Sequence, residues 1–402
     1  MPPIVQRLSF KTKYLLISSL YLIVATYSWA YKYFSDRYRN YRIFEGVFWH
    51  ERNKINLYAV YPLEYHANDS NHFGPLFGIL IAPFALLPDG IGMLLFNLLN
   101  AFLFVWAINH LLLTNNRRLF ILFFCIIEFA NSVHSIQVNP IIAVLIILSF
   151  LMIEKGKEEW STLFIVLGTL IKLYPVVGLS FFMFSKNKSK FIVSGFFWLA
   201  ILICLPMLIS SKTFILQSYV DWYHCLLEKN SSNISLASGQ DMSIMGIFRH
   251  ITNNSSIPNT PFLLFGAVVF ISSLFRFNQY HSLKFRMYIL SSALLMVVLF
   301  STGSETPTYI IAVTGAMIWL FLQEKPFSPG NIILLVALLL ITGLGATDAI
   351  PKFIRKSVVV PLRLNVWPCA IVWLMMSYEL LFRRFKDPDF LIQKSPWISR
   401  LT

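Results

Sequence analysis

Long uninterrupted apolar runs recur along this chain, and they constrain its fold more than any other feature. Ile141–Ile153 and Met287–Phe300, for example, contain no charged residue. Only 13% of all residues are charged, about half of the roughly 25% that is typical of soluble domains, and the mean hydropathy is +0.65. The runs are continuous, whereas the strands of a membrane β-barrel alternate apolar and polar residues. The sequence therefore excludes a soluble globular enzyme and predicts an all-α, polytopic membrane protein.

The apolar segments predict a bundle of about 12 transmembrane helices, several of them shorter than the roughly 20 residues of a simple span. We place these helices near residues 13–31, 91–113, 119–135, 139–153, 160–173, 175–185, 190–210, 261–275, 286–303, 307–322, 331–347 and 366–382. The segments 160–173 and 175–185 meet at Pro175. Because proline interrupts a helix, we expect these two segments to form one broken pair.

Basic residues gather in short loops between the apolar runs. The groups are Arg7, Lys11 and Lys13; Arg117 and Arg118; Lys155 and Lys157; Lys186, Lys188 and Lys190; Arg276, Lys284 and Arg286; Lys325; and Arg383, Arg384 and Lys386. All of them fall on one side of the membrane if the proline-containing segment 73–89 is an interfacial or re-entrant helix. The positive-inside rule then places both termini in the cytoplasm. The net charge of +14 reflects this bias and attraction to anionic lipid headgroups, not nucleic-acid binding.

This topology makes residues 1–402 a single integral-membrane domain with two long extracytoplasmic segments. The first segment covers residues 32–90 and the second covers residues 211–261. Both are rich in polar and aromatic residues. Because long loops on a rigid scaffold often carry function, we expect the active site on this side of the membrane.

The first extracytoplasmic segment combines carboxylates with arginines. Its acids include Asp36, Glu45 and Glu64, and Arg42 lies among them. A carboxylate can deprotonate an incoming hydroxyl while a guanidinium holds a phosphate. The alternative for each of these residues is a solvated loop whose charges only pair with one another.

Further polar residues lie inside or at the outer ends of the predicted helices, where they are energetically expensive. They are Glu128, Gln137, Asn139, Lys172, Tyr174 and Glu305, and the second extracytoplasmic segment adds Arg249 and His250. In the predicted topology they all lie toward the outer leaflet, which indicates one functional site. The alternative is hydrogen bonding between helices, with Lys172 extending its ammonium to the interface.

Several familiar cofactor and metal motifs are missing from the sequence. It contains no phosphate-binding GxxxxGK[ST] loop, no GxGxxG at a strand–helix junction, no HExxH and no His/Cys spacing typical of zinc sites. The segments outside the membrane are too short for a nucleotide-binding domain. A donor carried by a lipid fits these constraints, and we predict neither a cofactor nor a required metal.

Several segments together resemble glycosyltransferase family 87. They are YPLEY, HFGPLFGILIAPFALLPD, LLFNLLNAFLFVWAI, SIQVNPIIAVLIIL, EKGKEEWSTLFIVLGTLIKLYPVVGL, DMSIMGIFRHI and SETPTYIIAV. The order and spacing of the segments carry the resemblance, which extends over about residues 35–385 and is strongest to the Bacteroidetes branch of the family.

This resemblance implies a GT-C-type membrane fold and a hexosyltransferase activity. Such an enzyme transfers a mannose-like sugar, with inversion, from a polyprenyl-phosphate donor to a lipid or glycan acceptor outside the cytoplasm of a bacterial inner membrane. The resemblance also implies a catalytic acid in the first extracytoplasmic segment. Asp36 matches best, and Glu45, Glu64 and Glu128 are the alternatives. The donor phosphate would then meet Lys172, Arg249 and Arg42.

Two other classes of function are compatible with the sequence. A transporter or flippase for a lipid-linked glycan would also need cationic groups in the membrane, but along a path open to both sides. A non-catalytic subunit of an envelope-assembly complex would need no catalytic acid. The absence of a visible internal repeat does not favour an inverted-repeat transporter.

Overall fold

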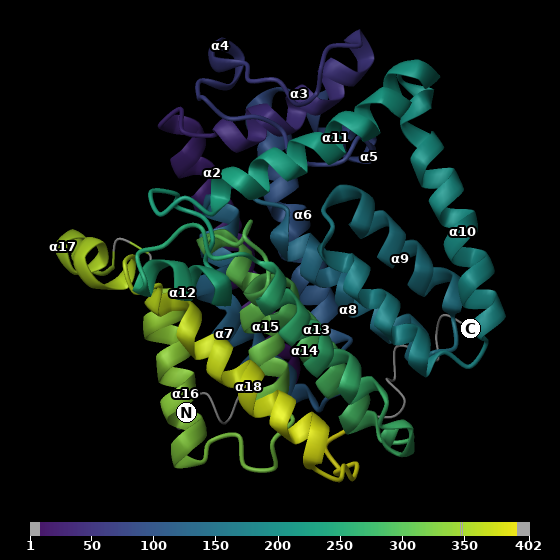
Figure 1. The fold of residues 1–402 in the computed structure, drawn as a ribbon, viewed down its shortest axis with the longest axis vertical. Helices are drawn as coiled ribbons and strands as arrows, with labels where there is room; N and C mark the ends of the chain where they lie inside the picture. The colour runs from purple at the N-terminus through teal and green to yellow at the C-terminus, as the bar shows by residue number, and fades with distance from the viewer. Residues whose placement is uncertain (1–8, 346, 348, 392–402) are drawn as a thin grey trace. The chain divides into compact units, whose positions relative to one another are not determined.

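The computed structural model describes residues 9–345, 347 and 349–391, and these residues form helices and no β-strand (Figure 1). The predicted all-α fold class is therefore confirmed. Contacts between residues divide the chain into two compact units. Unit 1 contains Met1–Ile23, Phe102–Asn131 and Asn233–Thr402, and unit 2 contains Val24–Ala101 and Ser132–Ser232. Three long helices, α2 (Phe10–Phe34), α6 (Asp89–Asn109) and α7 (Asn115–His134), run from one unit into the other.

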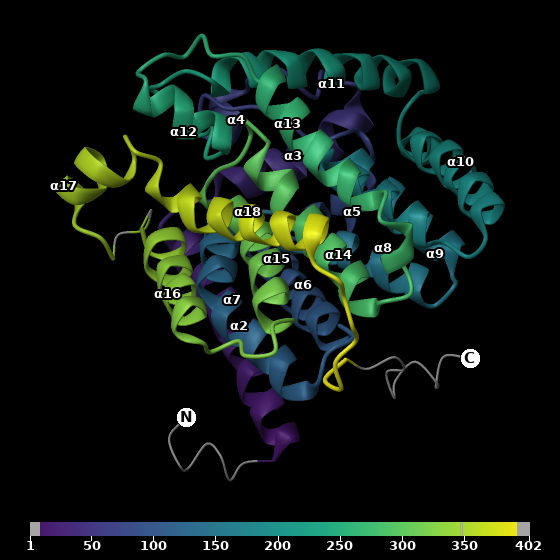
Figure 2. The same cartoon turned by 60° about the horizontal axis from the view of Figure 1, so that its bottom comes forward.

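Unit 2 carries residues 32–90, the predicted first extracytoplasmic segment, and the middle of the chain. Its further helices are α3 (Arg39–Asn53), α4 (Pro62–Tyr65), α5 (Leu76–Ala85), α8 (Asn139–Glu154), α9 (Glu158–Ile171), the 3₁₀ helix η1 (Tyr174–Phe184), α10 (Lys188–Cys204), η2 (Leu205–Leu208) and nearly all of α11 (Lys212–Asn233). Helix α9 packs between α8 and α10 (Figures 1 and 2). Helix α8 is apolar around its whole circumference and is accordingly buried almost throughout.

An aromatic cluster joins α3 to α5 within unit 2. The ring of Phe44 meets the rings of Phe73, Phe77 and Phe96 edge to face, with centroids 5.1, 5.2 and 5.7 Å away. Such edge-to-face pairs stabilise packing beyond the area they bury. The cluster therefore fixes α3, which carries several of the predicted site residues.

Unit 1 is built on the buried pair α14 (Leu283–Leu299) and α15 (Tyr309–Phe321). Gly315 allows this pair to approach closely, because a Cβ there would lie only 2.7 Å from the carbonyl oxygen of Ser291. Unit 1 also contains α12 (Ile244–Ile251), α13 (Thr260–Leu274), η3 (Phe277–Gln279), η4 (Thr306–Thr308), α16 (Pro329–Ala337), the π-helix η5 (Leu338–Gly343), α17 (Lys352–Ile354), η6 (Arg355–Val359), η7 (Leu364–Val366) and α18 (Trp367–Phe382).

The apolar segments that predict transmembrane helices all coincide with helices in the structure. Among the residues that the structure describes, four helical stretches are long and apolar enough to cross a membrane: Phe10–Phe34, Asp89–Asn109, Lys188–Leu208 and Leu364–Phe382. Most of the other predicted spans correspond to shorter helices, so the number of spans stays a prediction. The break at Pro175 is confirmed, because α9 ends at Ile171, Lys172 is extended and η1 begins at Tyr174.

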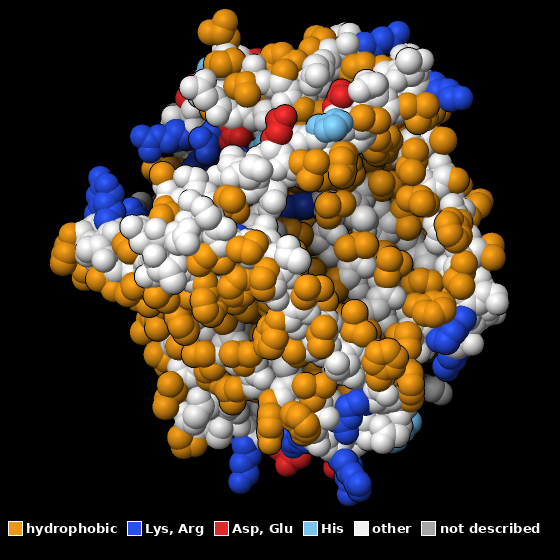
Figure 3. Space-filling view, in the orientation of Figure 1, with side chains coloured by type: hydrophobic (Ala, Val, Ile, Leu, Met, Phe, Trp, Pro, Cys, Tyr) orange, Lys and Arg blue, Asp and Glu red, His pale blue; other side chains and the backbone are white. Residues whose placement is uncertain are grey.

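Two of the long stretches, Phe10–Phe34 and Lys188–Leu208, expose apolar side chains over much of their length. In Lys188–Leu208, only 17% of the most apolar window is buried. Figure 3 shows hydrophobic side chains along α10 and, in unit 1, along α18, where Leu374 and Phe382 are exposed. An apolar surface of this extent suits contact with lipid rather than water.

Residues 211–261, predicted as a loop, contain considerable helical structure. They include the 22-residue helix α11 and the shorter α12. Tertiary contacts hold α11, since the indole Nε1 of the buried Trp222 donates to the carbonyl oxygen of His72 at 3.0 Å. Residues 73–89 contain the ten-residue helix α5 with Pro83 inside it. Its interfacial or re-entrant character stays a prediction.

Candidate active site

Asp36 lies in the tight turn that joins α2 to α3 in unit 2. The backbone N–H groups of Asp36 and Arg37 donate to the carbonyl oxygens of Tyr33 and Lys32 at 3.1 and 2.9 Å, which ends α2. Asp36 has a φ of 55°, a left-handed conformation that aspartate adopts more readily than most residues. The turn thereby projects a carboxylate from the end of a long helix.

This carboxylate faces a polar pocket of about 370 Å³. The described residues that line the pocket are Lys32, Asp36, Arg37, Arg39, Asn40, Arg42, His66, His134, Ser135 and Ile136. Asp36 is the one acid in this set, beside four Lys or Arg residues and two histidines. The pocket therefore presents a single carboxylate in a strongly cationic setting.

Arg42 and His66 hold the Asp36 carboxylate. Arg42 Nη2 lies 2.5 Å from Oδ1, and His66 Nδ1 lies 3.6 Å from Oδ2. The hydrogen bond from Arg42 lowers the pKa of Asp36 below its ordinary value, and His66 adds to the effect. The Asp36 side chain is nevertheless 62% exposed. Asp36 is thus ionised at neutral pH and open to a ligand, as a general base must be.

The other predicted acids of the first extracytoplasmic segment differ from Asp36 in setting. Glu45 lies one turn after Arg42 on α3, and burial, helped by the charge of Asp89, raises its pKa to about 8. Glu64 on α4 places Oε2 3.0 Å from His50 Nε2. The residues that line the polar pocket include neither glutamate. Of these carboxylates, Asp36 is the best placed to accept a proton.

A turn between α7 and α8 forms one wall of the polar pocket. His134, Ser135 and Ile136 line it, and the Asn40 side chain of α3 donates to the Ser135 carbonyl oxygen at 2.6 Å. Ile136 has a φ of 49°. That conformation is a genuine outlier for a β-branched residue and stores strain of the kind that collects at functional sites.

The same turn leads to a second cationic centre. Gln137 follows in the turn, and the buried Asn139 begins α8. Lys172 Nζ donates to Asn139 Oδ1 at 3.0 Å and lies 4.7 Å from the ring centroid of Tyr174. The structure thus brings together Asn139, Lys172 and Tyr174. An ammonium has three N–H donors, so Lys172 can bind an anion while it keeps the contact with Asn139.

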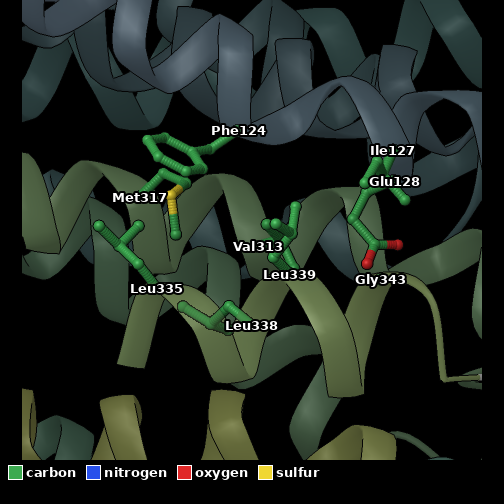
Figure 4. Close-up of a pocket in the computed structure, with 9 residues that line it drawn as sticks. All are labelled: Phe124, Ile127, Glu128, Val313, Met317, Leu335, Leu338, Leu339 and Gly343. Carbon is green, nitrogen blue, oxygen red and sulfur yellow. The ribbon is translucent and has the colours of Figure 1, made fainter. Parts of the chain in front are cut away.

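Glu128 lies in unit 1, in a narrow and mostly apolar pocket. Figure 4 shows its carboxylate directed toward Gly343. The buried Oε1 has no hydrogen-bond partner, and Asn131 Nδ2 lies 3.5 Å from Oε2 while it donates to the Gly343 carbonyl oxygen. The free space, about 10 Å³, holds at most one water molecule. It does not admit a sugar.

Arg249 is fully engaged inside unit 1. Its Nη1 lies 2.6 Å from Asp241 Oδ2, its Nε donates to the Ile257 carbonyl oxygen at 3.0 Å, and Nη2 also contacts Asn259. The side chains of Asp241 and Arg249 are 2% and 1% exposed. Through these contacts Arg249 links α12 to the chain segments before and after this helix.

His250 and Glu305 also lie in unit 1. Burial lowers the pKa of His250 to about 4, with Arg363 as the second cause, so its ring is neutral at neutral pH. Glu305 caps the short helix η4, where its side chain accepts from the Thr308 backbone and the Thr308 hydroxyl is paired with the Glu305 backbone. Both residues lie near the buried Asp241–Arg249 pair. His250 directly follows Arg249, and the residue before Glu305 is bonded to this region, because the Met242 backbone N–H donates to the Ser304 carbonyl oxygen at 3.0 Å.

Sequence reasoning missed Lys32, Arg37, Arg39 and His134 as pocket residues, and it missed Arg363 altogether. The first three flank Asp36 in the stretch KYFSDRYR, and this clustering around one acid was the available signal. Arg363 is completely buried in unit 1, where Nη2 donates to the carbonyl oxygens of Ser238 and Gln240. No sequence pattern marks it.

The site holds no obvious metal centre. Among the residues that the structure describes, no group of three or more His, Cys, Asp or Glu side chains is arranged to bind a metal ion. The polar pocket itself offers one carboxylate and several cations.

Comparison with known proteins identifies the family. The model of glycosyltransferase family 87 matches residues 71–302, more than half of the chain. A comparison with curated protein sequences finds no match. The matched region includes Asn139, Lys172 and Arg249, and it begins after Asp36 and Arg42. The apolar helices described above and this match together indicate a membrane glycosyltransferase. The chain belongs to glycosyltransferase family 87.

Proposed function

We propose that this protein is a GT-C-type hexosyltransferase that uses a polyprenyl-phosphate sugar, mannose-like, as donor. The acceptor is a lipid or glycan hydroxyl on the extracytoplasmic side of a bacterial inner membrane. One observation carries the proposal: Asp36 is an ionised, accessible carboxylate in a pocket otherwise lined by cations and neutral polar groups.

The reaction is a single displacement. Asp36 takes the proton of the acceptor hydroxyl as that oxygen attacks the anomeric carbon of the sugar. The bond between the anomeric carbon and the phosphate oxygen breaks at the same time, and polyprenyl phosphate leaves with its electron pair. Attack from the face opposite the leaving group inverts the configuration. Arg42 positions the Asp36 carboxylate through the 2.5 Å contact.

Lys172 holds the donor phosphate in this scheme. Its ammonium lies between the buried Asn139 and the ring of Tyr174, which fixes its direction. The turn that carries Gln137 connects Asn139 to the wall of the polar pocket. A monophosphate leaving group needs no divalent metal when a fixed cation balances its charge.

Replacement of Lys172 tests this assignment. We expect Lys172→Ala to raise the donor KM about 10–100-fold, because a hydrogen bond to a charged group contributes about 1.5–3 kcal/mol. Lys186→Ala, which removes the same charge from an exposed loop, is the matched control and should leave the donor KM unchanged. An unaltered donor KM in a well-folded Lys172→Ala enzyme would remove Lys172 from the site.

The orientation of the chain can be tested by thiol labelling. In a variant whose four native cysteines are replaced by serine, we expect Ser70→Cys to react with a membrane-impermeant maleimide added from outside. Asn115→Cys, at the start of α7, should react only after the membrane is opened, because the basic residues beside it place it in the cytoplasm. Labelling of Asn115→Cys from outside would invert the proposed topology.

A further inference from the structure

The polar pocket has more positive charge than the proposed reaction uses. Arg42 is paired with Asp36, and the donor phosphate is assigned to Lys172. Lys32, Arg37 and Arg39 also line the pocket. Arg37 and Arg39 are exposed, and no described acid forms an ion pair with any of these three residues.

The start of α3 adds to this surplus. Arg39 is the first residue of the helix and Arg42 lies in its first turn, which contains no acid. The N-cap residue, Tyr38, makes no side-chain capping bond. Cations at a helix N-terminus oppose the helix dipole, whereas a bound anion is stabilised there by the free N–H groups. The arrangement is unfavourable alone and becomes favourable with an anion in the pocket.

The pocket has room for such a group beside the base. Its volume is about 370 Å³, within the range of small-ligand sites. His66 contacts Asp36 and also lines the pocket, as does His134 at the end of α7. Arginine side chains bind phosphate and carboxylate groups with directed N–H donors.

We propose that the acceptor carries a negatively charged phosphate or carboxylate group, which Lys32, Arg37 and Arg39 bind while Asp36 takes the proton of the acceptor hydroxyl. This inference rests on the proposed function and names the acceptor class of the same site. The charged group fixes the acceptor at the end of α3, and its hydroxyl is thereby presented to the carboxylate. The enzyme selects anionic acceptors over neutral ones.

A comparison of matched acceptors tests this selection. The full chain is reconstituted in proteoliposomes with its donor and offered an alkyl glycoside or the same glycoside bearing a phosphate diester. We expect the charged acceptor to have a KM about tenfold lower, the lower end of the range for charged hydrogen bonds, because the arginines are exposed. The preference should shrink as salt is raised, since salt screens exposed charges.

Variants of the two arginines show whether the anion that they bind belongs to the acceptor or to the donor. Arg37→Gln with Arg39→Gln should abolish the preference for the charged acceptor and leave the donor KM unchanged. The matched control is Arg52→Gln with Lys54→Gln, which removes two exposed charges near the other end of α3 and should alter neither KM. A rise in the donor KM alone would place the donor phosphate in this pocket and overturn the inference, while the proposed function would stand.

Two further outcomes decide the inference independently of that comparison. Equal KM values for the charged and neutral glycosides overturn it. If no sugar is transferred from any donor, the proposed function fails, and binding of the two glycosides to the detergent-solubilised protein is measured by calorimetry. Binding of the charged glycoside no tighter than the neutral one then overturns the inference as well.

Discussion

Asp36→Asn should lower the turnover number about 10²–10⁴-fold, the usual effect of removing a general base. Asparagine keeps the shape of aspartate and tolerates the left-handed backbone at this position, but it cannot accept the proton. Donor affinity should be kept, because the donor phosphate is held elsewhere. Initial rates at saturating donor and acceptor, together with the donor KM, give both quantities.

Other acids in the same region are the controls for Asp36→Asn. Asp69 lies 3.8 Å from His72 Nε2 and does not line the polar pocket, so Asp69→Asn should change turnover far less. Glu45→Gln, Glu64→Gln and Glu128→Gln complete the series. If Asp36→Asn keeps near-normal turnover and one of these three is inactive, the base is that residue. If Asp36→Asn, Glu45→Gln, Glu64→Gln and Glu128→Gln all stay active, none of these four carboxylates is the base.

Asp241→Ala should lower the free energy of unfolding by about 3–5 kcal/mol, the range observed when one partner of a buried ion pair is removed. The loss leaves Arg249 without its carboxylate, although both side chains are almost completely buried. The buried Arg363 makes the loss worse, because its charge also interacts with the charge of Asp241. Chemical unfolding in detergent, followed by tryptophan fluorescence, measures the change.

The control for Asp241→Ala is an exposed ion pair. Glu159→Gln removes the partner of Lys190, whose Nζ lies 2.6 Å from Glu159 Oε2 at a half-exposed position, and it should change stability little because exposed pairs contribute little. A change for Asp241→Ala no larger than that for Glu159→Gln would show that the Asp241–Arg249 pair does not hold unit 1 together.

Apolar length predicted the apolar helices well but did not predict the helices of mixed polarity between them. Each predicted apolar segment is a helix, because burial or lipid contact of an uncharged run leaves the backbone no better way to satisfy its hydrogen bonds. Helix α11 was missed because its residues are of mixed polarity and its stability comes from contacts such as that of Trp222 with His72. Such long-range contacts leave no local signal.

The candidate site was predictable in its residue types and only partly in its contacts. Asp36 and Lys172 stand out in the sequence as charges at the ends of apolar helices. The contact of Lys172 with Asn139 joins residues from different predicted helices. Both residues were predicted to lie toward the outer leaflet, so this contact was plausible from the sequence. Arg249 stood out as a phosphate ligand, yet the left-handed turn at Asp241, with a φ of 56°, brings that acid to Arg249. A single-residue backbone conformation of this kind is invisible in composition or periodicity.

Sugar transfer in proteoliposomes tests the central claim most directly. The purified chain is supplied with radiolabelled polyprenyl-phosphate mannose, glucose or arabinose and a mixture of lipid and glycan acceptors, and product is separated from donor by chromatography. We expect one donor to yield labelled product of inverted configuration with the wild-type protein and about 10²–10⁴-fold less with Asp36→Asn. A well-folded wild-type protein that transfers sugar from none of these donors, or that only moves labelled donor across the bilayer, would contradict the account.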